Sequence, residues 1–296
     1  MEVPTPYKVS TITATAFVCS KLDIAVLFRD IVLAASFEEA GVIRCEFIDE
    51  NKQPVARGVD VRRANRRRNS KKKRFENQAT FLIRPTAQAP NIVNTKVFRN
   101  GNVQMTGNKS YDDGVRCVEL LINAIRGVPD AAESPDDLRV DNYLIRLINS
   151  DFRVPFRINN PALQRAMMTS DYVSIYEPCI YPGVKILYYY RSDRASGRCG
   201  CHPHCGGKSC KKITIAVFQS GAVIITGAID MVMLDAAYAY TAGMLVALRE
   251  KIEQKSMSAL VSKMAAALGK PRDQNILNFC TARAKATCAP IKSCCS

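Results

Sequence analysis

The chain has 296 residues, a net charge of +15 and a hydrophobic content of 47%. This hydrophobic content is typical of a globular protein with a buried core and excludes an intrinsically disordered chain. The basic balance favours polyanionic partners, nucleic acid first and an anionic membrane second, and is no evidence about the fold.

The N-terminus MEVPTPYKVS lacks the basic start and apolar run of a signal peptide, and no stretch reaches the ~18 uninterrupted apolar residues of a membrane span. We therefore expect a protein that is neither secreted nor embedded in a membrane. In such a protein the 12 cysteines are free thiols or metal ligands rather than disulfides.

The first half of the chain reads as a strand, a helix, several strands and a second helix. YKVSTITATAFVCSKLDI (7–24) indicates a strand followed by a helix start, and VIRCEFI (42–48) is rich in β-formers. In VFRNGNVQMTG (97–107), Asn-Gly between alternating segments is typical of a hairpin. Apolar residues at helical spacing then predict a helix that ends near Gly127; they are Val115, Val118, Ile122 and Ile125.

The second half repeats this order. LRVDNYLIRLINSDFRVPFRI (138–158) matches 7–24, VKILYYY (184–190) is matched to 42–48, and VFQSGAVIITG (217–227) repeats the hairpin. The nearly all-apolar segment 230–248 predicts a deeply buried helix. We predict a pseudo-symmetric α+β protein with repeats in 1–128 and 139–254 and an extension at 255–296.

Two insertions are expected at matching places, just before each repeated hairpin. The first, about 51–80, carries nine basic residues and no acid between Arg62 and Arg74. This run indicates a solvated loop, an arm that contacts phosphates or a nuclear-import signal, and the last two uses are compatible. The basic residues are Arg62, Arg63, Arg66, Arg67, Arg68, Lys71, Lys72, Lys73 and Arg74.

The second insertion, about 191–211, contains GRCGCHPHCGGKSC and both histidines of the chain. Soft and borderline donors at this density favour a structural zinc site, although the spacing matches no common zinc finger and the cysteines of a glycine-rich loop are the alternative. The candidate ligands are Cys199, Cys201, His202, His204, Cys205 and Cys210.

The extension contains KSMSALVSKMAAALGK (255–270), which reads as an amphipathic helix closed by Gly269. Four cysteines follow and are either metal ligands or redox-prone thiols; they are Cys280, Cys288, Cys294 and Cys295.

The strand period of two places the side chains of each hairpin on two faces. One face carries Phe98, Asn102, Gln104 and Thr106 in the first hairpin, and Phe218, Ala222, Ile224 and Thr226 in the second. Such a mixture suits the minor groove of DNA, where aromatic side chains can wedge between base steps. The alternative is that both phenylalanines are core residues, repeated because the fold is repeated.

Several segments, in the same order in both halves, resemble the TATA-box-binding-protein family. YEPCIYPGV (176–184) is similar to the family's YEPELFPGL, SGAVIITGA (220–228) to SGKVVLTGA, and CSKLDI (19–24) to GCKLDL. The resemblance covers about 8–48, 92–128 and 140–250. It implies a saddle, in which two repeats form one curved antiparallel sheet with a concave DNA-binding face and helices on the convex face.

The resemblance also assigns residues to functions. Three of the family's four wedge phenylalanines match Phe98, Tyr181 and Phe218, and the fourth falls near Glu39, with Phe37 as its nearby substitute. The groove-floor positions fall on Thr11, Gln104, Thr106, Ile145, Ile224 and Thr226, and two backbone-contacting lysines fall on Asn102 and Ala222. In the loop that docks a general transcription factor of the B type, Glu177 matches the first acidic residue, Cys179 replaces the second, and Ile180 lies beside them.

The leading interpretation is a non-enzymatic transcription initiation factor that binds and bends duplex DNA and recruits a B-type factor and RNA polymerase machinery. It implies a nuclear location, or a viral replication compartment, and no membrane or small-molecule partner. No catalytic triad is expected, because both histidines lie in the cysteine cluster. The alternatives are a protein-interaction platform that no longer reads DNA and a basic nucleic-acid-packaging protein.

Overall fold

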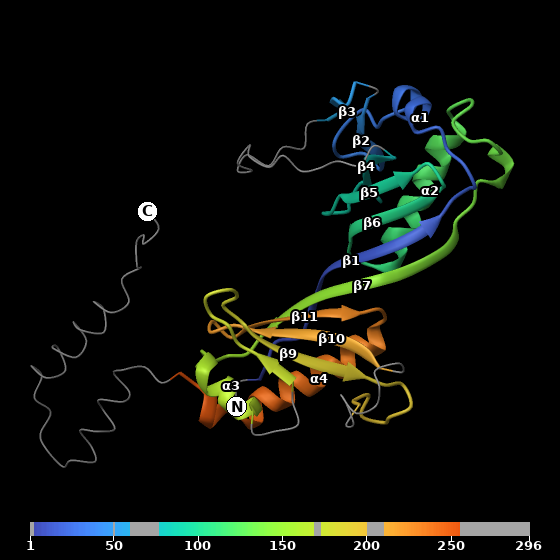
Figure 1. The fold of residues 1–296 in the computed structure, drawn as a ribbon. Helices are drawn as coiled ribbons and strands as arrows, with labels where there is room; N and C mark the ends of the chain where they lie inside the picture. Colours follow the sequence, from blue (N-terminus) through green and yellow to red (C-terminus); the bar gives the residue numbers. More distant parts are fainter. Residues whose placement is uncertain (1–2, 50, 60–76, 169–172, 200–209, 255–296) are drawn as a thin grey trace, which may run out of the picture.

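The computed structural model describes residues 3–49, 51–59, 77–168, 173–199 and 210–254. Eleven strands form one antiparallel sheet in the order β3-β2-β4-β5-β6-β1-β7-β11-β10-β9-β8 (Figure 1). The strands are β1 (Lys8–Phe17), β2 (Gly41–Ile48), β3 (Pro54–Gly58), β4 (Gln78–Arg84), β5 (Val93–Phe98), β6 (Asn102–Asn108), β7 (Asp141–Arg153), β8 (Val173–Ile175), β9 (Val184–Tyr190), β10 (Lys211–Val217) and β11 (Ala222–Ala228). The helices are α1 (Ile24–Asp30), α2 (Tyr111–Arg126), the short 3-10 helix η1 (Pro135–Asp137), α3 (Asn160–Met168), α4 (Met231–Ala247) and α5 (Arg249–Ile252).

The two long strands β1 and β7 pair in the middle of the sheet and join its two halves (Figure 1). Each then pairs with the second strand of a hairpin: β6 of the hairpin β5–β6 lies beside β1, and β11 of the hairpin β10–β11 lies beside β7. The predicted hairpins, and the strands that precede α1 and α3, are thus confirmed. The division of the chain into two pseudo-symmetric repeats stays a prediction.

The helices cover one face of the sheet, over two separate hydrophobic cores. In the first core, Val103 and Met105 of β6 face α2, whose Leu121 is fully buried. In the second, Val223 and Ile225 of β11 pack with Leu234 and Leu245 of α4, among others. The other face of the sheet is free of helices in the part of the chain that the structure describes.

The turn of each repeated hairpin is hydrogen-bonded to the residue that follows a central strand. Gly101 has φ +72° and its carbonyl accepts from the Val18 amide at 3.0 Å, directly after β1. Gly221 has φ +82° and its carbonyl accepts from the Val154 amide at 2.9 Å, directly after β7. The sequence repeats glycine here because the turn has a positive φ and its backbone lies against the crossing chain.

The sequence analysis did not foresee β4, which pairs with β5 in the first half as β9 pairs with β10 in the second. β9 pairs directly with β10, but β2 does not pair with β5, because β4 lies between them. The prediction that 42–48 corresponds to 184–190 is therefore wrong, because the two segments occupy different positions in the sheet. The two insertions also do not fall at matching places: the first falls between β2 and β4 and contributes β3 and the start of β4, whereas the second falls between β9 and β10.

Helix α4 corrects a second expectation. Its limits agree with the predicted 230–248, and Asp230 caps it by accepting from the Met233 amide at 2.7 Å. Only its sheet-facing side is buried, however, and Val232 and Val246 on its outer side are exposed. The prediction of deep burial was wrong, because a helix on an open sheet buries only the side that faces the sheet. No other described element covers the outer side of α4. Within the described part of the chain, no helix has the length and apolarity needed to cross a membrane.

Candidate nucleic-acid interface

The helix-free face of the sheet carries the side chains that alternation predicted. Along β6, Asn102, Gln104 and Thr106 are exposed, while Val103 and Met105 between them are buried. Phe98 and Phe218 follow the same face at the ends of their strands, and both are half-buried. Neither phenylalanine belongs to the two hydrophobic cores, so the interpretation of these residues as core is wrong.

The centre of this face is a polar ladder across four strands. Thr106 of β6 pairs with Thr13 of β1, and Thr226 of β11 pairs with Asn149 of β7. The Thr226 hydroxyl donates to the Asn149 Oδ1 atom. Thr11 pairs with Asn149 on the other side, and its hydroxyl is buried without a hydrogen-bond partner among the described residues. The exposed amide of Gln104 and the exposed Thr106 on this face are available to a ligand.

Asn149 and Thr13 were missed by the sequence analysis, and Ile145 was misplaced. Ile145 packs against the second hydrophobic core, on the side of the helices. The reason is a register shift between Thr13 and Ala14 in the pairing of β1 with β7. A bulge of this kind moves every later side chain to the other face, and nothing in the sequence marks it.

A hollow of about 220 Å³ opens on the same face in the first half. Phe98 and Phe17 line it together with Asn102, Gln104 and Arg146, among others. The Arg146 Nε atom donates to the Thr15 hydroxyl at 2.8 Å, which fixes the guanidinium over β1. This places a positive charge beside the polar ladder, within the candidate interface.

In the second half, an aromatic pair stands at the end of the sheet. The rings of Tyr181 and Phe218 lie 5.7 Å apart between centroids, and the Lys185 ammonium sits 4.5 Å from the Tyr181 ring centroid. A side chain at Gly183 would come within 3.0 Å of one ring and 3.1 Å of the other, so the backbone itself fills the space beside them. The Tyr181 amide donates to the Glu177 carbonyl at 2.8 Å, which closes the turn that holds the pair. The structure thus brings together two residues that are far apart in the sequence.

Phe37 does not form the corresponding pair with Phe98. Because β4 lies between β2 and β5, β2 runs in the same direction as β5, and the start of β2 lies near the start of β5. Phe98 ends β5, so Phe37 stands at the opposite end of these strands. There its ring is covered by the Arg84 guanidinium, 4.8 Å from the ring centroid. The assignment of Phe37 as the fourth wedge is therefore wrong.

The loop assigned to partner binding is accessible. Ile180 is 78% exposed, and Glu177 and Cys179 are exposed beside it.

Two other predicted sites fall largely outside the described residues. The basic arm, Arg62 to Arg74, lies wholly outside them, as do Cys201, His202, His204 and Cys205 of the cysteine cluster. Of that cluster the structure describes Cys199, which is buried, and Cys210, which is half-buried. Among described side chains, no group of three or more His, Cys, Asp or Glu is placed to hold a metal. Zinc binding stays a prediction.

Comparison with known proteins gives two sequence relatives. The chain is 28% identical over 270 residues to a TATA-box-binding protein-like protein of Acanthamoeba polyphaga mimivirus, covering 83% of this chain and 66% of the relative. It is 24% identical over 131 residues to the TATA-box-binding protein of Archaeoglobus fulgidus, covering 44% of this chain and 57% of the relative. The chain thus spans no more than about two thirds of either relative.

Among solved structures, Methanococcus jannaschii TBP is similar with a TM-score of 0.44 and 17% identity, covering 83% of this chain and 99% of that one. No family model matches the chain. The sequence relatives, with the motifs that the chain shares in both halves, support its similarity to the TATA-box-binding-protein family, as a divergent relative.

Proposed function

We propose that the chain is a DNA-binding transcription factor that inserts the helix-free face of its sheet into the minor groove of duplex DNA and bends it. The observation that carries this proposal is the composition of that face: a ladder of threonines and one asparagine between aromatic side chains at the strand ends. Hydroxyl and amide groups match the acceptors of an A·T minor groove, and aromatic rings can unstack a base step.

The departures from the family pattern suggest how the interface differs from that of its relatives. Asn102 and Ala222 replace phosphate-contacting lysines, whereas Lys96, Lys185 and Arg146 place positive charge elsewhere on or beside the open face. Cations near the phosphates supply most of the affinity, and base contacts supply the sequence preference. We therefore expect retained bending with an altered base preference.

Bending is tested by fluorescence energy transfer on short end-labelled AT-rich and GC-rich duplexes, at two salt concentrations. We expect bending of AT-rich duplex that is lost in Phe218→Ala and in Phe98→Ala. Phe37→Ala is the matched control, because that phenylalanine lies at the opposite end of the strands and its loss leaves bending unchanged.

Other outcomes favour other functions. Salt-sensitive binding without bending or base preference points to the basic arm and to packaging, with a log–log slope of ~0.9 for each phosphate neutralised. If the protein does not bind duplex DNA, its function is that of a protein-interaction platform. The proposed factor needs no catalytic step, and it would act in the nucleus or in a viral replication compartment.

Recruitment is the second part of the proposal. The exposed loop at Glu177 and Ile180 is where a B-type general transcription factor would dock, followed by polymerase machinery. Ile180→Arg is expected to abolish a ternary complex with such a factor in a gel-shift assay while leaving duplex bending intact. Equal loss of both activities would show that the loop acts through the sheet rather than through a partner.

A further inference from the structure

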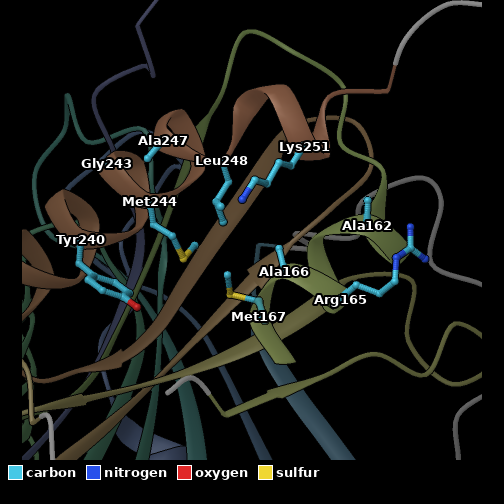
Figure 2. Close-up of a pocket in the computed structure, with 10 residues that line it drawn as sticks. All are labelled: Ala162, Arg165, Ala166, Met167, Tyr240, Gly243, Met244, Ala247, Leu248 and Lys251. Carbon is cyan, nitrogen blue, oxygen red and sulfur yellow. The ribbon is translucent and has the colours of Figure 1, made fainter. Parts of the chain in front are cut away.

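A groove of about 850 Å³ lies on the helix-covered side of the second half, between α3 and the C-terminal part of α4 (Figure 2). Its walls are mostly small or apolar: Ala162, Ala166 and Met167 from α3, and Gly243, Met244, Ala247 and Leu248 from α4 and its end. Two cations, Arg165 and Lys251, stand at its edges. Small side chains on both walls allow another helix to approach closely.

The outer side of α4 continues this apolar surface. No charged residue occurs in α4 after Asp235, and Val246 next to the groove is 42% exposed. Among the described residues, none comes within 4 Å of a side chain built at Gly243, so the space there is open. An amphipathic helix would carry polar groups on such a side, so its apolar character calls for a covering element.

The chain itself continues from the edge of this groove. Lys251 of α5 lines the groove, and three residues later the Gln254 amide donates to the Arg157 carbonyl at 2.8 Å, which fixes the point of exit. Residues 255–296 follow, outside the described part of the chain. Any segment near the start of this extension is tethered beside the groove at an effective concentration on the order of millimolar.

The first part of the extension has the pattern of a helix with one apolar side. Its large apolar residues recur at spacings of three and four, and they are Met257, Leu260, Val261, Met264 and Leu268. On a helical projection its three lysines fall on the opposite side; they are Lys255, Lys263 and Lys270. Gly269 and Pro271 then mark its end. A helix over 257–268 would be roughly 18 Å long.

We propose that residues 257–268 form a helix that docks its apolar side into the groove between α3 and α4. Burial of that side supplies the attraction, because the segment carries no acid to pair with Arg165 or Lys251. Its lysines face solvent, away from these two cations. The docked extension would cover the side of the sheet opposite the open face, so the proposal holds whether or not the chain binds DNA.

The test is hydrogen exchange, read by mass spectrometry, on the full chain. Wild type is expected to show at least ten-fold protection of amides in 257–268 relative to an unstructured peptide. Gly243→Arg places bulk and a third cation in the groove and should abolish this protection. Ala239→Arg, one turn earlier on an exposed position of the same helix, is the matched control and should retain it.

A variant of the extension tests the same contact from the other side. Leu260→Ser with Met264→Ser changes no described residue, and it should remove protection from 257–268 and speed exchange in α3. Free exchange of 257–268 in wild type would overturn the proposal, as would equal protection in Gly243→Arg and wild type. Protection that appears only with increasing protein concentration, together with a dimer in light scattering, would assign the groove to a second copy and also overturn it.

Discussion

Replacement of Gly101 by alanine tests why the two hairpins share their turn. An added Cβ at Gly101 would stand 1.5 Å from the Cys19 carbonyl oxygen, a distance that only backbone movement can relieve. The left-handed conformation at φ +72° costs a non-glycine residue about 1–2 kcal/mol. Displacing the hydrogen bond from the Val18 amide to the Gly101 carbonyl adds about 0.5–1.5 kcal/mol. We expect Gly101→Ala to lower the free energy of unfolding by about 1.5–3.5 kcal/mol.

The measurement is urea unfolding followed by circular dichroism, with the midpoints compared at equal slope. Gly221→Ala should behave similarly, because its Cβ would stand 2.6 Å from the Phe156 carbonyl oxygen. Gly243→Ala is the control: the position is helical, no described residue comes within 4 Å of an added Cβ, and the change should stabilise the protein by about 0.5–1 kcal/mol. A Gly101→Ala protein as stable as wild type would refute the role assigned to the turn.

Three further predictions concern single side chains. Asp230→Ala removes the cap of α4 and should cost about 1 kcal/mol in urea unfolding, so an unchanged midpoint would contradict the capping role. At pH 8, iodoacetamide should modify the exposed Cys179 and spare Cys117, because burial raises the pKa of the Cys117 thiol to about 12; equal rates by mass spectrometry would contradict this. The folded-state pKa of Cys117 lies above its unfolded-state value. The contribution of this thiol to the free energy of unfolding is therefore fully present below pH ~9 and is lost as the pH rises toward 12. Thr226→Val should weaken binding to AT-rich duplex several-fold while Thr226→Ser retains it, and an unchanged affinity would remove the Thr226–Asn149 pair from the interface.

Local patterns in the sequence predicted the elements that position the candidate site. The alternation in 102–106 identified which side chains of β6 face away from the core, and the turn glycines identified both hairpins. The end of α2 at Gly127 also followed from the spacing of its apolar residues and the glycine after them. These features depend on residues within a few positions of one another, which is why the sequence carries them.

The sequence by itself determined the alternation, the turns, the end of α2 at Gly127 and the resemblance to the TATA-box-binding-protein family. Only the tertiary structure decided which strands are neighbours. The insertion of β4 reverses the direction of β2 relative to β5 and sends Phe37 to the far end of the sheet, and one register shift beside Thr13 turns Ile145 toward the core. The pairing of distant strands has no local signal, because it is set by which edges meet once the central strands have formed. The same reason explains α4: its sequence is apolar all round, and what covers each side depends on elements elsewhere in the chain.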